Sequence, residues 1–335
     1  MEFRVVCLNC DDLYPVGAHR ERGPRTANEL AEKVRRLAAV LRRCFGPDLP
    51  DLIGLCEVAD LGLGHDVLTA ISPGRYSAVW QQPPPPADPL EPQTGLLLGY
   101  NTDLFEVVHE TPAELTVEED HRYHWFAVLL RLRKAGRAFA RFWAVVNHWP
   151  ADFGRGATRS TWPRMLVSQA LGEFYMNTAR DVAGGMLLIG DFNCEPFEPP
   201  LTGQFALGER IIGVREHNRV LNRRTRRPYF YNPMWRWLGE HTAIEYKTPT
   251  AGTRPPGTHT TRDERTRLSA CWRCIDQILV SERLLVGGPA RLLEDSIVIT
   301  PDDPVASDHC AVGARFEYTV PVAPAAGQAA ASGGP

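Results

Sequence analysis

The chain has 335 residues, 44% of them hydrophobic, and a formal net charge of −3. This length and apolar content are sufficient for one large hydrophobic core. The nearly balanced charge excludes the global basic field that marks many nucleic-acid binders, so any attraction for phosphate must be local.

The sequence predicts neither a targeting segment nor a membrane segment. Met1 is followed almost at once by a strand-like pattern, which leaves no room for a signal peptide. No apolar run approaches the ~20 residues that span a bilayer. The eight cysteines lack the spacing of a small secreted disulfide framework. We therefore expect a soluble cytoplasmic protein without membrane insertion and without an obligate protein partner.

Two C-x-x-C pairs, Cys7/Cys10 and Cys271/Cys274, have a spacing that suits zinc. Cys7, however, lies inside an apparent strand, whereas zinc knuckles are usually tight turns rich in glycine. We therefore expect buried free thiols, with a zinc site as the alternative.

The first part of the chain predicts a strand, a helix and a second strand. Residues 2–9 alternate as a strand that ends at Asn9. Residues 26–45 show helical spacing, with a capping box formed by Thr26 and Glu29. The buried strand 52–57 ends in Glu57, a carboxylate that is costly to bury unless a positive group such as a metal ion lies beside it. The alternative is that Glu57 is simply solvated at the wet end of the strand.

The middle of the chain predicts antiparallel strands, because strand-like stretches follow one another without helices between them. A proline-rich surface loop at 81–93 comes first. The strand-like stretches that follow are 95–100, 105–108, 125–132 and 139–147. The last leads into His148, either a functional ring or a packed one. A helix is then expected, capped by Ser160 or Thr161 and carrying Pro163 in its first turn.

The stretch Met186-Leu-Leu-Ile-Gly-Asp-Phe-Asn193 reads as a buried strand that leaves the core at Gly190. If the chain stays extended, Asp191 and Asn193 point to the same side, since strand side chains repeat every second residue. The alternative is that both residues open a turn, which their side chains favour.

The last part of the chain predicts strands at 275–281, 296–300 and 311–318. Asp276 interrupts the apolar face of the first, and Ser307-Asp308-His309 lies between the other two. Residues 321–335, dominated by small residues and proline, are expected to be a disordered tail. We therefore expect one catalytic domain over residues 1–320.

Residues 200–270 are harder to interpret. They contain Arg223, Arg224, Arg226 and Arg227, followed by aromatic residues that include Trp235. Basic groups beside aromatic rings suit a single-stranded or flipped nucleic acid. A solvated loop beside a satellite core is an equally good interpretation. Residues 254–267, rich in proline, threonine and charges, are expected to form a mobile loop.

Six polar motifs occur at the ends of these elements, in the following order: Asn9, Glu57, Asn147-His148, Gly190-Asp191-Phe192-Asn193, Ile275-Asp276 and Ser307-Asp308-His309. In this order the sequence resembles the endonuclease/exonuclease/phosphatase superfamily. The resemblance implies an α/β fold, a four-layered sandwich of two mixed β-sheets flanked by helices. It also implies a metal-dependent hydrolase of phosphoric esters.

The resemblance implies a metal site formed by Glu57, Asp308 and Asn9. Carboxylate oxygens are hard ligands that suit Mg²⁺ or Mn²⁺ and suit zinc poorly.

The resemblance also implies the catalytic roles. Asp191 would accept a proton from the attacking water, and Asn193 would hold the phosphoryl oxygens. His309 and His148 would contact the phosphate from opposite sides, and Asp276 would orient the ring of His309. Whether Asp191 or His309 is the base stays open.

The sequence thus favours a phosphodiesterase, in particular a nuclease that binds DNA or RNA and cleaves it by direct attack of water. No G-x-S-x-G elbow, Cys-His signature or P-loop indicates another chemistry. One alternative is a phosphatase or phospholipase acting on inositol phosphates or sphingomyelin-like lipids, although no basic amphipathic helix indicates a membrane surface. Another is a catalytically silent binding module.

Overall fold

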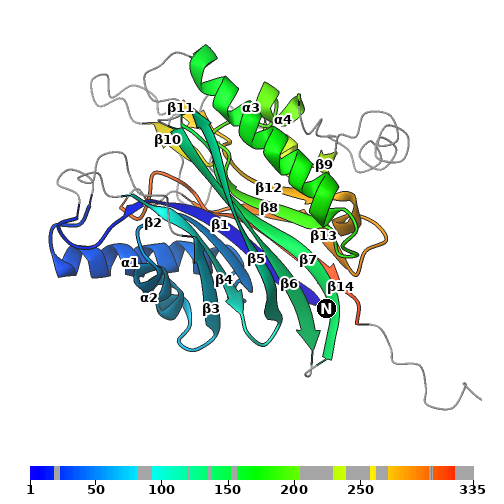
Figure 1. Cartoon of the computed structure of the whole chain (residues 1–335). Helices are drawn as coiled ribbons and strands as arrows, with labels where there is room; N and C mark the ends of the chain where they lie inside the picture. Colours follow the sequence, from blue (N-terminus) through cyan, green and yellow to red (C-terminus); the bar gives the residue numbers. More distant parts are fainter. Residues whose placement is uncertain are drawn as a thin grey trace, which may run out of the picture.

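The structure is a computed structural model. It describes residues 1–18, 23–81, 93–118, 121–134, 137–151, 157–203, 229–238, 257–261, 271–301, 303 and 305–320. Two six-stranded sheets dominate these residues (Figure 1). Sheet A has the order β13 (Ala290–Ile299), β14 (Val312–Tyr318), β1 (Glu2–Leu13), β2 (Leu52–Val58), β4 (Gly95–Asn101) and β3 (Tyr76–Gln81).

Sheet B has the order β5 (Phe105–Glu118), β6 (His121–Lys134), β7 (Arg137–His148), β8 (Met186–Asp191), β12 (Asp276–Ser281) and β9 (Phe230–Tyr231). Each sheet contains one parallel pair, β1 with β2 and β7 with β8, among antiparallel neighbours. The expectation of two mixed sheets is therefore confirmed. A two-stranded ribbon of β10 (His259–Thr261) and β11 (Cys271–Arg273) lies apart from both sheets.

Helices cover the outer faces of the two sheets (Figure 1). On sheet A these are α1 (Ala27–Arg43) and α2 (Leu61–Ile71), and on sheet B α3 (Ala157–Phe174). The remaining helical segments are short: η1 (Tyr175–Ala179), α4 (Pro199–Thr202), η2 (Pro233–Trp237) and η3 (Glu282–Leu284). A core of buried residues fills the space between the sheets. The four-layered α/β sandwich implied by the resemblance is confirmed.

Strand alternation explains the buried cysteines. Cys7 points into the core between the sheets, whereas Cys10, three residues later, points into the core under α1 and α2. Because they lie on opposite faces of sheet A, these two thiols cannot share a zinc ion. Both are free and fully buried, as expected. The side chain of Cys271 lies outside the described residues.

Two sequence-based expectations are wrong. The helix α3 begins at Ala157, so Pro163 is inside it rather than in its first turn. The burial of Val167 and Leu171 against sheet B outweighs the one backbone hydrogen bond that proline cannot donate. The expected mobile loop 254–267 contains β10 and the fully buried Thr258; the rest of that segment lies outside the described residues, as do 82–92 and 321–335. No described helix has the length and apolar character required to cross a membrane.

Candidate active site

Neighbouring strand ends bring the polar motifs together. In sheet B, Asp191 at the end of β8 pairs with His148 on one side and with Asp276 on the other. In sheet A, Asn9 pairs with Cys56, which precedes Glu57. The residues of sheet A and those of sheet B lie at the same edge of the sandwich, since the side chain of Asn9 in sheet A reaches Asp191 in sheet B. The edge therefore collects acids, amides and imidazoles from strands that are far apart in the sequence.

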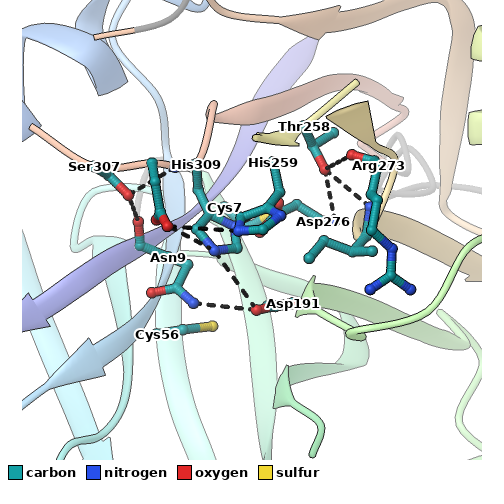
Figure 2. Close-up of polar contacts among 12 residues, drawn as sticks. Cys7, Asn9, Cys56, Asp191, Thr258, His259, Arg273, Asp276, Ser307 and His309 are labelled. Atoms are coloured by element: carbon teal, nitrogen blue, oxygen red, sulfur yellow. Dashed lines mark hydrogen bonds and ion pairs between the residues drawn. The ribbon is translucent and has the colours of Figure 1, made fainter. Parts of the chain in front are cut away.

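Asn9 connects the two sheets through its side-chain amide. Its Nδ2 donates to Glu57 Oε1 at 3.0 Å and to Asp191 Oδ2 at 3.1 Å. Both donor hydrogens of the amide are thus used, one for each carboxylate. Its Oδ1 accepts a hydrogen bond from the backbone N–H of Asp11 at 3.1 Å. Asn9 lies beside Asp191 in Figure 2. The amide fixes the separation of two carboxylates that would otherwise repel each other.

Asp191 and Asn193 meet through a turn rather than through an extended strand. The strand ends at Asp191, and Asn193 has a φ of +48°. The backbone N–H of Asn193 donates to Asp191 Oδ1 at 2.7 Å, and its Nδ2 donates to Asp191 Oδ2 at 3.1 Å and to the carbonyl of Trp149 at 2.8 Å. The turn interpretation is therefore correct, and the turn itself places the two side chains together. Burial, followed by the charge of Asp276, raises the pKa of Asp191.

His309 is held by an acid at its inner ring nitrogen. Its Nδ1 lies 2.8 Å from Asp276 Oδ2, and its Nε2 faces Asp191 Oδ2 at 4.0 Å. Burial, the largest influence, lowers the pKa of this ring, but the carboxylates of Asp276, Asp191 and Asp308 outweigh it and raise the pKa to about 10. His309 is thus a cation at neutral pH.

A second imidazole lies on the Glu57 side of the same carboxylate. His148 Nε2 lies 3.4 Å from Glu57 Oε1 and 3.8 Å from Asp191 Oδ2, and a quarter of its side chain is exposed. Burial would raise the pKa of Glu57, but the charge of His148 and the hydrogen bond from Asn9 together lower it. Asp191 Oδ2 therefore has both imidazoles within 4.0 Å.

Backbone strain is concentrated at this edge. Among the described residues, four that are not glycine have positive φ: Asp11 (+49°), Asp12 (+58°), Glu57 (+60°) and Asn193 (+48°). Each costs about 1–3 kcal/mol, and such residues cluster at functional sites. The surrounding structure must hold them in place, which it does in part through the bond from the backbone N–H of Asp12 to Glu57 Oε2 at 2.8 Å.

Comparison with known proteins agrees with this geometry. The sequence matches the Endonuclease/Exonuclease/phosphatase family over residues 11–238. The chain belongs to this family. Its members are hydrolases of phosphoric esters that depend on divalent metal ions. No curated protein gave a significant match.

Solved structures of the family share the fold at low identity. The human Nocturnin catalytic domain with bound sulfate is 18% identical, with a TM-score of 0.54 over 95% of each chain. D. rerio TDP2 complexed with a single-strand DNA product is 12% identical, with a TM-score of 0.56 over 94% of this chain and 99% of that one. ANGEL2, described as a 2′,3′-cyclic phosphatase, in complex with adenosine-2′,3′-vanadate, is 13% identical, with a TM-score of 0.54 over 94% and 95%.

The residues around Glu57 fit the divalent cation that this family uses. Asp11, Asp12 and Glu57 offer carboxylate oxygens within 4.8 Å of one another. Burial raises the pKa of Asp11 to about 6, and the charges of Asp308 and Glu57 add to the effect. Crowded carboxylates of this kind are a hard oxygen donor set, suited to Mg²⁺ or Mn²⁺. A cation would relieve their mutual repulsion.

The expected ligands are only partly brought together. Glu57 and Asn9 are in contact, but the Asp308 carboxylate lies against two imidazoles, 3.5 Å from His259 Nε2 and 3.6 Å from His309 Nε2. Sequence reasoning missed Asp11 and Asp12, although both lie within three residues after Asn9 and could have been found as acids at a strand end.

Other predicted and missed residues lie around this centre. Arg223, Arg224, Arg226 and Arg227 lie outside the described residues. Trp235 is half-buried in η2, and its indole nitrogen has no hydrogen-bond partner among the described residues. Sequence reasoning also missed Arg164 of α3, which is almost fully buried and donates to the carbonyl of Asn193 at 2.7 Å. A lone arginine inside a helical pattern gives no signal of this contact.

Proposed function

We propose that the protein is a divalent-metal-dependent phosphodiesterase that hydrolyses DNA or RNA by direct attack of water. The observation that carries the proposal is the convergence on one carboxylate. Asp191 Oδ2 receives the Asn9 amide at 3.1 Å, with His148 Nε2 at 3.8 Å and His309 Nε2 at 4.0 Å. Hydrogen-bond donors and cations arranged around one base can bind a phosphate and activate a water beside it.

Asp191 is the proposed general base. Burial and Asp276 raise its pKa, and a raised pKa makes a carboxylate a better proton acceptor. The water oxygen forms a bond to phosphorus, its proton passes to Asp191, and the ester oxygen leaves on the opposite side. Asn193 fixes the carboxylate through two hydrogen bonds. The other hydrogen of its amide donates to the carbonyl of Trp149, so the contact with the phosphoryl oxygens that the resemblance implies would have to replace one of these bonds.

The two histidines are the proposed phosphate contacts. His309 carries a positive charge at neutral pH because the nearby carboxylates outweigh the effect of burial. Asp276 holds Nδ1, so Nε2 remains available to donate to a phosphate oxygen. His148 supplies a second, partly exposed ring nitrogen. Donors fixed before the reaction cost little reorganisation when charge develops on the phosphate.

Mg²⁺ or Mn²⁺ is the proposed cofactor. Glu57 would hold it together with Asn9 and Asp308, as the resemblance implies, and with Asp11 and Asp12, which lie beside Glu57. When bound, the ion would neutralise a phosphate oxygen and stabilise charge that develops on the leaving group. A cytoplasmic location is also proposed, because Cys7, Cys10, Cys44, Cys56 and Cys194 are buried free thiols.

Two neighbours support a nucleic-acid substrate. One was solved with a single-strand DNA product and another with an adenosine-2′,3′-vanadate. The basic cluster Arg223, Arg224, Arg226 and Arg227, with Trp235, would contact the phosphates and bases of such a substrate. Because ANGEL2 is described as a 2′,3′-cyclic phosphatase, a phosphatase acting on a small nucleotide is the second candidate.

An activity panel tests the proposal. Single-stranded DNA, duplex DNA, RNA, a small phosphodiester, a cyclic nucleotide and an inositol phosphate would each be incubated with Mg²⁺, Mn²⁺ or a chelator. We expect chelator to abolish turnover of the accepted substrate, and Asp191→Asn and His309→Ala each to lower kcat by about 10²-fold or more. The matched control His65→Ala changes an exposed histidine of α2 and should leave turnover unchanged. Turnover that survives in chelator would overturn the metal-dependent mechanism.

Replacing Arg223, Arg224, Arg226 and Arg227 with alanine tests the substrate class. We expect weaker cleavage of polynucleotides and unchanged hydrolysis of a small phosphodiester. The affinity for polynucleotides should also depend less on salt, because a protein with fewer phosphate contacts releases fewer counterions when it binds. Equal loss on both substrates would argue against a polynucleotide role for this cluster.

A further inference from the structure

The Thr258-His259 dipeptide lies between two catalytic segments that are separated in the chain. Thr258 is fully buried, and His259 begins β10, which pairs with β11. An additional β-bridge joins His259 to His309. Figure 2 shows Thr258 beside Arg273 and Asp276, and the His259 ring beside His309. No part of the proposed mechanism uses this dipeptide.

The hydroxyl of Thr258 binds the backbone at Asp276. Its Oγ1 accepts hydrogen bonds from the backbone N–H groups of Ile275 at 3.0 Å and Asp276 at 2.9 Å, and it donates to the carbonyl of Arg273 at 3.3 Å. A hydroxyl has one donor and two acceptor positions, and here all three are used. The position where β12 begins is therefore set by one side chain.

The main chain of Thr258 binds both segments. Its N–H donates to the carbonyl of Arg273 at 2.8 Å, and its carbonyl accepts from the N–H of Cys310 at 2.6 Å. Thr258 thus joins the strand that carries Asp276 to the residue that follows His309. The 2.8 Å contact between Asp276 and His309 depends on these two backbones keeping their separation.

The ring of His259 extends this arrangement to Asp308. Its centroid lies 4.4 Å from that of His309, with an interplanar angle of 47°, and its Nε2 lies 3.5 Å from Asp308 Oδ2. The other oxygen of Asp308 lies 3.6 Å from His309 Nε2. The carboxylate is therefore held between two imidazoles. Because Asp308 is half exposed, it would otherwise sample other rotamers.

We propose that Thr258 and His259 are positioning residues: Thr258 aligns Asp276 with His309, and His259 fixes the ring of His309 and the carboxylate of Asp308. The kinetic effects expected from this proposal depend on the proposed phosphoester hydrolysis. Its structural content, the orientation of the His309 ring, can be measured without any substrate. Partners that orient a catalytic or ligating side chain typically contribute about 10- to 100-fold to activity or metal affinity.

Thr258→Val and Thr258→Ser form the first test. Valine keeps the shape but removes all three hydroxyl contacts, so kcat on the substrate accepted by the wild type should fall by about 10- to 100-fold with KM unchanged. Serine keeps the hydroxyl and should restore most of kcat. The control Thr102→Val removes an exposed hydroxyl bonded to the carbonyl of Arg75, far from the site, and should leave kcat unchanged.

His259→Phe and His259→Ala form the second test. Phenylalanine keeps an aromatic ring against His309 but loses Nε2, whereas alanine loses both. We expect the Mg²⁺ concentration for half-maximal rate to rise in both variants, and kcat to fall further in His259→Ala. Identical kinetics in wild type and His259→Ala would overturn the role of this ring.

Nuclear magnetic resonance of protein labelled with ¹⁵N-histidine gives the readout that does not depend on activity. The Nδ1–H proton of His309, assigned by its loss in His309→Asn, should shift upfield in Thr258→Val and return in Thr258→Ser. An unchanged resonance in Thr258→Val, with only lower stability, would mean a structural role and would overturn the proposal. If the wild type hydrolyses none of the substrates, the proposed function fails, while the resonance still tests the positioning.

Discussion

The two ends of β2 carry carboxylates in different environments, one buried and one partly exposed. Asp51, immediately before the strand, is 1% exposed and accepts hydrogen bonds from the backbone N–H of Arg4 at 3.1 Å, from Arg75 Nη2 at 2.7 Å and from Asn101 Nδ2 at 2.9 Å. Glu57, near the other end, has a left-handed backbone and lies beside Asp11 and Asp12. At the first end one acid has two arginines and an amide around it. At the second end one imidazole, one amide and one backbone N–H face Glu57, and two further acids lie beside it.

This difference separates stability from function. At the Asp51 end, each charge has an opposite charge or a donor, so the arrangement stabilises the fold without any ligand. At the Glu57 end, the excess of negative charge and the strained backbone cost free energy that the fold must supply elsewhere. The excess is useful only if a cation and a phosphate bind there. Substitutions at the two ends should therefore have opposite consequences.

The largest effect is expected for Asp191→Asn. Loss of the general base should lower kcat by about 10²- to 10⁴-fold. The free energy of unfolding should stay the same or rise, because burial and the charge of Asp276 raise the pKa of Asp191, so the folded state disfavours the ionised carboxylate. Steady-state kinetics and urea denaturation measure the two quantities. Asp66→Asn, at an exposed position on α2, is the matched control. Lower stability with full turnover in Asp191→Asn would contradict the assignment of Asp191 to function rather than to stability.

Asp51→Ala should show the opposite pattern. The substitution removes the acid beside Arg75 and leaves Arg4 paired with Asp48 alone. We expect the free energy of unfolding to fall by about 2–4 kcal/mol, since these cations are partly exposed. The turnover of the folded fraction should be unchanged. Denaturant unfolding together with kcat per folded molecule checks this, and a loss of kcat without a loss of stability would contradict it.

Glu57→Gln should weaken the response to divalent cations. In wild type, Mg²⁺ at 100 times its Kd should stabilise the fold by about 2.7 kcal/mol, because it binds only the folded state. In Glu57→Gln, the affinity should fall by about 10-fold or more. Thermal unfolding during a Mg²⁺ titration measures both values. Glu110→Gln, at an exposed position on β5, controls for nonspecific binding. Identical titrations for wild type and Glu57→Gln would remove Glu57 from the cation site.

The smallest effect is expected for Arg164→Lys. Arg164 donates to the carbonyl of Asn193 and lies 3.8 Å from Glu198. Lysine has a single ammonium and cannot reproduce both contacts, so the turn that holds Asn193 should loosen and kcat should fall by about tenfold or less. Unchanged kcat, with a stability equal to that of wild type, would show that the turn at Asn193 keeps its conformation without Arg164.

The sequence was most informative where polar residues interrupt apolar strands. Asp191 ends the buried strand β8, Asp276 begins the buried strand β12, and Asn9 lies in the last part of β1. The mixed sheets that bring them together follow from the order of strands with and without helices between them. A polar residue next to an apolar run can be recognised from its immediate neighbours in the sequence, without knowledge of distant residues. The positions that carry most of the site could therefore be named before their contacts were known.

Contacts between distant segments explain what was missed. The helix α2 begins Leu-Gly-Leu-Gly, a poor helix pattern, yet a Cβ at Gly64 would lie 2.1 Å from Leu97 Cδ1, so glycine lets the helix pack against β4 without moving that buried side chain. Thr258 resembles any threonine in a polar loop, because its partners Asp276 and Cys310 lie many residues away. The left-handed backbone of Glu57 also has no signature in the sequence.

Hydrolysis of the accepted substrate in ¹⁸O-labelled water, in a single turnover with Mg²⁺ present, tests most directly whether the converging strand ends activate water against a phosphoester. Direct attack predicts one ¹⁸O atom in the phosphate product, with no product when a chelator replaces Mg²⁺. Unlabelled phosphate after that first turnover would contradict it, because the water oxygen would then not have formed the new bond to phosphorus.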